Sequence, residues 1–288
     1  MGALFDKIAE WLEGILVDAS MDNLKSLFDS VNEQVSNVAG QVGTSPAGFS
    51  PSIFGMIRNI SETVIMPIAG IILTFIACYE LIQLVTEHNN LANLDLWIIF
   101  KWIFKTFAAV LIITNTFNIV MAVFDVAQHV IGQSGSLISG STQITAMDMD
   151  VVKETLEDME LGGLLAVFLE TFILKLMLKI MSAIIFVIIY GRMIEIYLMT
   201  SLAPIPMATL ANREQSQVGQ NYLRSLFALG FQGFLILICV GIYAVLIQNF
   251  ALSDNLMAGV WSVAGYTILL CFTLFKTGSL AKSVFNAH

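Results

Sequence analysis

The sequence predicts an all-α integral membrane protein, a polytopic helical bundle with about five transmembrane helices and amphipathic helices at its N-terminus. Hydrophobic residues make up 57% of the 288 residues and charged residues only 12%, whereas a soluble domain of this length carries about 25% charged residues. Several stretches exceed the ~18 apolar residues that mark a membrane-spanning helix. They are unbroken and lack the alternating pattern of an outer-membrane barrel, so their backbone must form α-helices.

Residues 1–60 are expected to form amphipathic N-terminal helices followed by a linker. Apolar residues recur at helical spacing from Leu4 to Ile15 and again from Leu24 to Val35, which predicts two amphipathic helices. The polar face of the first is acidic, whereas a helix that lies on anionic lipid has a basic polar face. Packing against partner subunits and lying on lipid both stay open. Residues 37–51 are rich in Gly, Ser, Pro and Gln, as linkers are.

Residues 61–288 form the predicted transmembrane bundle. Its five apolar spans cover about residues 63–85, 97–126, a long segment that begins at 161, then 225–250 and 256–275. The last two contain no charged residue, so each can cross a core of roughly 30 Å at about 1.5 Å per residue. They must join in a tight hairpin around Asp254.

The segment from Leu161 to Met207 is too long for a simple span, because as one helix it would measure about 70 Å, roughly twice a bilayer. It could cross once or twice. A double crossing would place the basic C-terminal end outside, against the positive-inside tendency, so one overlong helix is preferred. Other subunits or the amphipathic segments must then cover its surplus turns, because exposed apolar helix aggregates in water.

Basic residues predict the orientation in the cytoplasmic (inner) membrane. Lys101, Lys105, Arg213, Arg224, Lys276 and Lys282 all fit one cytoplasmic side. Residues 125–160 hold seven acids and one lysine, and their middle, SGSLISGSTQIT, is loop-like. We therefore expect the N-terminus outside, an extracytoplasmic loop at 127–160, a cytoplasmic loop at 204–224 and a cytoplasmic C-terminus.

Pro204 and Pro206 lie where the long helix reaches the cytoplasmic side. Each removes a backbone donor and biases the preceding residue, Ala203 or Ile205, toward extended geometry, so the helix is predicted to break there. The polar run that follows contains Arg213 and leads to Arg224. It is either a plain surface loop or a docking surface for partners, and the pattern leaves both open.

The sequence has no signature of an enzyme, a metal site or a cofactor site. His88, His129 and His288 are widely separated, and HExxH, CxxC and glycine-rich phosphate motifs are absent. We expect no catalysis and no cofactor, with bound anionic phospholipid as the one candidate ligand. Glu170 is the intramembrane carboxylate that is hardest to explain, and a polar functional role and a subunit contact both remain open.

Two lysine pairs, Lys101 with Lys105 and Lys175 with Lys179, have i, i+4 spacing, so each pair shares one helix face. Repeated around a ring of subunits, the four lysines would form a belt for anionic lipid headgroups or a positive collar for a translocating DNA strand. No other feature suits nucleic acid, because the net charge is −9 and no basic patch is interleaved with aromatics.

Several segments resemble those of a known family. They are GRMIEIYLMTSLAPIPMATLANRE, GQNYLRSLFALGFQGFLI, the opening MGALFDKIAEWLEGILVD, and FKWIFKTF with ITNTFNIVMAVFDVAQ. Together they resemble the TrbL-like conjugal transfer membrane proteins of integrative and conjugative elements of Gram-positive bacteria, over most of the chain. The resemblance implies a platform or channel subunit of a conjugative type IV secretion system that forms a homo-oligomer, works beside transport ATPases and supports DNA (nucleoprotein) transfer.

A small-solute membrane transporter is the alternative function. Transporters usually contain internal repeats with paired interrupted helices. Here the helix broken at Pro204 and Pro206 has no counterpart elsewhere in the sequence, which favours the secretion subunit.

Overall fold

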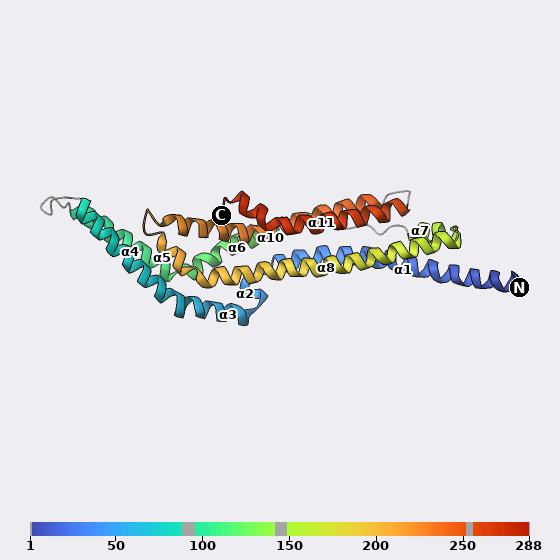
Figure 1. Cartoon of the computed structure of the whole chain (residues 1–288), viewed down its shortest axis with the longest axis horizontal. Coiled ribbons are helices and arrows are strands. Elements are labelled where there is room, and N and C mark those ends of the chain that lie inside the picture. The colour runs from blue at the N-terminus through green and yellow to red at the C-terminus, as the bar shows by residue number, and fades with distance from the viewer. Residues whose placement is uncertain (1, 88–95, 142–148, 252–255, 288) are drawn as a thin grey trace. The chain divides into compact units, whose positions relative to one another are not determined.

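The computed structural model describes residues 2–87, 96–141, 149–251 and 256–287, and every regular element in these ranges is a helix (Figure 1). The elements are α1 (Gly2–Val42), α2 (Pro46–Phe49), α3 (Pro51–Asn59), the π-helical turn η1 (Ile60–Ile65), α4 (Met66–Glu87), α5 (Leu96–Thr114), α6 (Thr116–Ser141), α7 (Met149–Glu157), α8 (Leu161–Leu202), α9 (Pro204–Thr209), α10 (Ser216–Ala251) and α11 (Leu256–Val284).

Within the described residues, five helical segments are long and apolar enough to cross a membrane: Pro51–Thr86, Leu96–Thr114, Leu161–Leu202, Ser216–Ile247 and Trp261–Val284. The predicted fold class, an all-α polytopic membrane protein, is confirmed. The segment that posed the choice between one and two crossings is a single helix, α8, of 42 residues.

Two predicted boundaries differ from the structure. The span expected at 97–126 is divided at Asn115 into α5 and α6, and the side-chain amide of Asn115 donates to the carbonyl of Leu111 at 2.9 Å, a local bond that competes with regular helix. The first part of SGSLISGSTQIT is helical, because α6 continues to Ser141, and residues 142–148 lie outside the described part. The position of residues 127–160 outside the membrane stays a prediction.

The N-terminal region is one continuous helix rather than two. α1 runs through residues 37–42, which were expected to belong to the linker. Composition alone underestimates the length of this helix. Most helical stability comes from packing of one face against a neighbour, and α1 packs against α8. The linker is reduced to the three residues between α1 and α2.

The chain divides into two compact units, which are described separately. Unit 1 comprises residues 1–42, 131–189 and 235–277, and unit 2 comprises residues 43–130, 190–234 and 278–288. The hairpin expected around Asp254 falls on residues outside the described part, as does His88.

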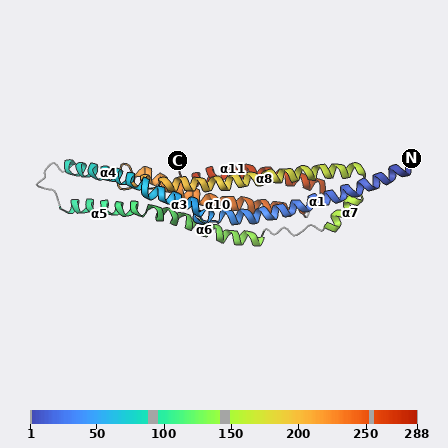
Figure 2. The same cartoon turned by 90° about the horizontal axis from the view of Figure 1, so that it is seen from below.

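In unit 1, α1 lies along the first part of α8 and runs in the same direction (Figure 2). The Asn23 amide donates to Thr171 Oγ1 at 3.4 Å, and eleven residues later the Gln34 amide donates to the carbonyl of Leu178 at 3.3 Å. The face that α1 buries contains Val17, Ser20, Leu24, Leu27, Val31 and Val38. This face of α1 therefore packs on the first part of α8, while the covering of the turns of α8 that extend beyond the membrane stays a prediction.

In unit 2, α4 and α5 form an antiparallel hairpin, and the short helix α9 packs against both. The Trp102 indole of α5 donates to the carbonyl of Ala77 in α4 at 3.2 Å. Small residues allow the close approach of α9, and Ala69, Ala109 and Ala208 belong to one buried cluster. A second buried cluster contains residues of α6, α8 and α10, among them Phe124 and Met193.

Candidate functional site

A hydrogen-bonded polar region surrounds the break between α8 and α9 in unit 2. Pro204 has no N–H, so the carbonyl of Thr200 loses its normal helical partner, and the N–H of Ala203 bonds to it instead at 3.3 Å. The Ser61 hydroxyl also donates to the Thr200 carbonyl, at 3.5 Å. The carbonyl of Met199 accepts from the Tyr222 hydroxyl at 2.8 Å. Hydroxyl groups from η1 and α10 therefore satisfy the broken helix end, as a site without bulk water requires.

The prediction that the two prolines interrupt the helix is correct, but the predicted local geometry is wrong. Ala203 has φ −49° and ψ −40°, which is right-handed helical rather than extended, and Ile205 lies inside α9. Pro204 occupies the first turn of the new helix α9, where proline is common because the N–H groups of a first turn have no partner within their own helix. Buried Pro204 and Ala208 pack α9 into unit 2, and this packing outweighs the local preference of residues that precede proline.

Opposite the break, the helix that continues from α3 into α4 contains the π-helical turn η1. The N–H of Met66 bonds to the carbonyl of Ser61, five residues back, and Ser61 is 1% exposed. Turns of this kind widen a helix and recur at functional sites. Neither η1 nor the role of Ser61 was predicted, because the segment ISETVI carries no pattern that distinguishes a π-turn from an α-turn.

The polar segment after α9 is a fixed turn. The Thr209 hydroxyl donates to the carbonyl of Pro206 at 2.7 Å and accepts from the N–H of Gly219 at 3.0 Å. A Cβ added at Gly219 would lie 2.7 Å from the Pro206 carbonyl oxygen, so this close approach requires glycine. The buried Asn212 side chain accepts from the N–H of Glu214 at 2.7 Å.

The exposed residues of this turn include Arg213, Glu214, Gln215 and Val218. The Gln83 amide, near the end of α4, donates to Glu214 at 3.4 Å, so the turn lies beside the C-terminal end of α4. Arg224, the other predicted docking residue, is half-buried in α10. Residues 210–218 thus form a polar surface held by hydrogen bonds, while its binding to a partner stays a prediction.

Arg192 is a buried charge in α8 that was not among the predicted site residues. It is 5% exposed, and its guanidinium donates from Nε to the carbonyl of Leu229 at 3.0 Å and from Nη2 to that of Gly230 at 3.1 Å. Nη1 is buried without a hydrogen-bond partner among the described residues. A Cβ added at Gly233 would lie 2.8 Å from the guanidinium. The sequence offered one signal, an arginine inside an apolar span. In the structure this arginine faces the segment LGFQG, which contains two glycines.

Glu170 lies in unit 1. Its Oε1 accepts from the Trp261 indole of α11 at 3.3 Å, and its Oε2 is buried without a partner in the described residues. The small pocket around it is otherwise apolar, with Ile173, Leu174 and Met177 among its lining residues. The carboxylate therefore links two helices, and both interpretations offered by the sequence stay open.

The two lysine pairs lie in different units. In unit 2, Lys105 pairs with Glu80 of α4, and the Lys101 ammonium lies 5.5 Å from the centre of the Trp97 ring. In unit 1, Lys175 donates to the Asn23 side chain at 3.4 Å, and Lys179 is exposed. Lys105 and Lys175 thus already have partners within the chain. A single belt or collar made from all four lysines stays a prediction.

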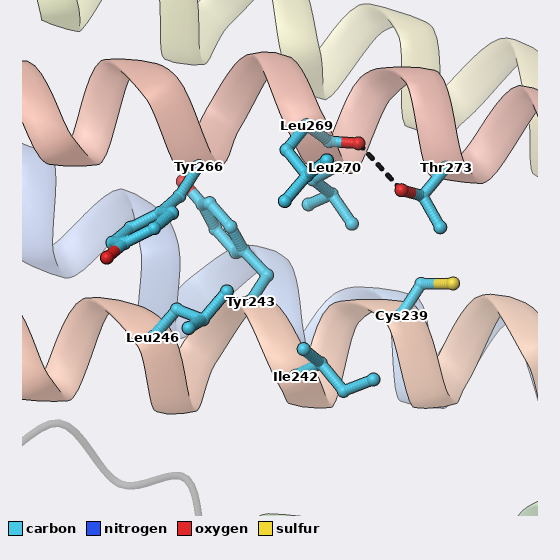
Figure 3. Close-up of a pocket in the computed structure, with 8 residues that line it drawn as sticks. All are labelled: Cys239, Ile242, Tyr243, Leu246, Tyr266, Leu269, Leu270 and Thr273. Carbon is cyan, nitrogen blue, oxygen red and sulfur yellow. Dashed lines mark hydrogen bonds between the residues drawn. The ribbon is translucent and has the colours of Figure 1, made fainter.

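A shallow pocket in unit 1 lies between α10 and α11 (Figure 3). Tyr243 and Tyr266 lie at one end of it and Cys239 and Thr273 at the other, with leucine and isoleucine side chains between. The Tyr243 hydroxyl pairs with that of Thr267 at 3.0 Å. The lining suits an apolar chain. Among the described residues, no group of three or more His, Cys, Asp or Glu side chains could hold a metal ion.

The five long apolar helices among the described residues define a multi-pass α-helical membrane protein. Residues 31–204, more than half of the chain, match the family model described as TrbL/VirB6 plasmid conjugal transfer like protein. The chain belongs to this family and is a membrane component of a conjugal transfer or type IV secretion system. No curated protein and no solved structure matches the chain.

Proposed function

We propose that the protein is a platform or channel subunit of a conjugative type IV secretion system, and that it assembles as a homo-oligomer to support DNA (nucleoprotein) transfer. One observation supports the homo-oligomer independently of the family match. Large apolar side chains stay exposed along α8 from Leu165, 50% exposed, to Leu198, 58% exposed. These residues are about 50 Å apart along the helix, whereas a bilayer core measures about 30 Å. Contact with further subunits would cover the surplus apolar surface.

The proposed location is the cytoplasmic membrane, with the N-terminus outside and the C-terminus in the cytoplasm. Within unit 2, the turn that carries Arg213 lies beside the C-terminal end of α4, so both fit the same side. Basic residues favour the cytoplasmic side. In unit 1, the short helix α7 contains Asp150, Glu154 and Glu157 and fits the outer side.

The proposed partners follow from these surfaces. The hydrogen-bonded polar surface at 210–218 would dock other secretion subunits, including the ATPases, because loops held by a scaffold often carry binding sites. Anionic lipid would bind near the exposed lysines. DNA would be the translocated substrate only.

A native mass measurement of the full chain in mild detergent, combined with a transfer assay in a complemented deletion strain, tests this function. We expect a ring of identical subunits and a loss of DNA transfer on deletion. A monomer or dimer would contradict the proposal and would favour the small-solute transporter.

A further inference from the structure

One segment of α8 in unit 1 is apolar enough to lie inside a bilayer. Residues 172–189 contain two lysines and no other charged residue. At about 1.5 Å per residue the segment is about 27 Å long, close to the ~30 Å core of a bilayer. Leu176, Ile180 and Val187 are 52%, 54% and 63% exposed. They share one side of the helix, so α8 presents an open apolar side over the whole segment.

The helix α1 packs along this segment on the other side of α8 (Figure 2). Thr171 and Leu178 accept hydrogen bonds from Asn23 and Gln34 of α1. They are rotated by roughly 170° about the axis of α8 from the centre of its apolar side. The helix α1 extends roughly two further turns beyond Gln34, so it accompanies nearly the whole apolar segment.

The exposed side of α1 along this segment is polar. Asp29 and Ser36 lie on the side of α1 opposite to buried Leu27. Among the residues of 22–41 whose side chains the structure describes, none of the exposed ones is apolar: they are Asp22, Lys25, Asp29, Glu33, Ser36, Asn37, Gly40 and Gln41. At one height, unit 1 therefore has an apolar side on α8 and a polar side on α1.

Lipid does not suit the polar side. Charged groups at the depth of the bilayer core almost always face the protein interior or a water-filled cavity, because hydrocarbon offers them no hydrogen bonds. Asp29 and Glu33 are exposed, so unit 1 does not cover them. Lys175, within the apolar segment of α8, turns toward α1 and donates to Asn23 at 3.4 Å. The two sides therefore need different surroundings, lipid beside α8 and water beside α1.

We propose that the polar side of α1 lines a water-filled space at the depth of the bilayer, and that α1 is the part of this subunit that borders the transfer path. This rests on the proposed homo-oligomer, because a single copy cannot enclose such a space. Cyclic symmetry turns the same side of every copy toward the axis. A ring with α1 inside and the apolar side of α8 outside gives both sides the surroundings they need.

Spin-label accessibility of the full chain in lipid vesicles tests this arrangement. In a background with Cys78, Cys239 and Cys271 changed to serine, a nitroxide label is attached at Ser36→Cys or at Ile180→Cys, two positions at about the same height. The vesicles contain phosphatidylethanolamine and phosphatidylglycerol. A nickel chelate relaxes labels in water, and oxygen relaxes labels in lipid. We expect the ratio of nickel to oxygen relaxation to be several-fold higher for Ser36→Cys than for Ile180→Cys.

Asp29→Cys, a second position on the polar side, should behave as Ser36→Cys does. A high ratio for Ile180→Cys as well would place this part of unit 1 outside the bilayer. A low ratio for both Ser36→Cys and Asp29→Cys would mean that lipid or another protein covers α1. Either result overturns the proposal.

Native mass of the unlabelled protein in mild detergent keeps this proposal separate from the proposed function. An intact ring combined with either of those results leaves the proposed function standing. Absence of any ring overturns both, because no neighbouring subunit then encloses the water-filled space.

Discussion

At the scale of single residues, the contact between Arg192 and Gly233 fixes how α8 meets α10 in unit 2. A buried charge is tolerated only where its hydrogen bonds are made, and the guanidinium reaches two backbone carbonyls because Gly233 has no side chain. The glycine is therefore part of the arginine site.

Gly233→Ala should displace the guanidinium and destabilise the protein by about 1–3 kcal/mol, the usual cost of overpacking. Gly265→Ala is the matched control, because nothing lies within 4 Å of a Cβ at that helical position. Melting temperatures in detergent compare the two. Equal melting temperatures would show that Arg192 does not need the space.

The Tyr222 hydroxyl offers a second prediction at this scale. Tyr222→Phe would leave the carbonyl of Met199 without its 2.8 Å donor, which costs about 1–3 kcal/mol for a buried acceptor. We expect a lower melting temperature than for Tyr266→Phe in α11. A Tyr222→Phe variant as stable as the wild type would mean that the broken helix end finds another donor.

At the scale of elements, the prediction agrees with the structure for helices that their own composition marks as apolar spans. It differs for elements whose bounds depend on contacts with residues far away in the sequence. Five spans could be predicted, because an apolar window needs only its own residues to mark a membrane helix. The length of α1 is explained by its packing against α8, and Ser61 of η1 donates to the carbonyl of Thr200, which is 139 positions away in the sequence. The prolines predicted the break itself, but not the hydroxyl groups that complete it.

Replacing both Pro204 and Pro206 with alanine tests the break. The restored donors would let α8 continue and would draw Ala208 away from the cluster that contains Ala69 and Ala109. We expect the turn at 210–218 to shift and transfer to fall in a mating assay. Pro51→Ala, at the first position of α3, is the control for proline loss. Normal transfer by the double variant would make the turn a plain connection.

At the scale of the whole molecule, orientation can be checked by labelling. Cysteines introduced at Ser141 and at Ser253, the latter outside the described residues, should react with an impermeant reagent in intact cells. A cysteine at Gln215 should react only after permeabilisation, because the basic residues favour the cytoplasm on that side. Labelling of Gln215→Cys in intact cells would refute the five-span orientation.

The lysines distinguish a lipid-bound platform from a conduit lined by charge. Changing Lys175 and Lys179 to glutamate would harm both lipid binding and passage of a strand, because a carboxylate repels phosphate groups. Glutamine removes the positive charge without adding this repulsion. Lipid contacts at the membrane surface are worth only about 1 kcal/mol per basic residue, while attraction of a strand falls with each ammonium group removed.

We expect the Lys175→Gln, Lys179→Gln double variant to keep the oligomer, lose bound anionic lipid on extraction and lower transfer only modestly. Lys175 also contacts Asn23 of α1 at 3.4 Å, so a melting curve must first show that α1 still packs on α8. The pair Lys101→Gln, Lys105→Gln, which removes the partner of Glu80, provides the comparison in unit 2. Near-complete loss of transfer with normal assembly and unchanged lipid content would instead indicate that these lysines line the path of the strand.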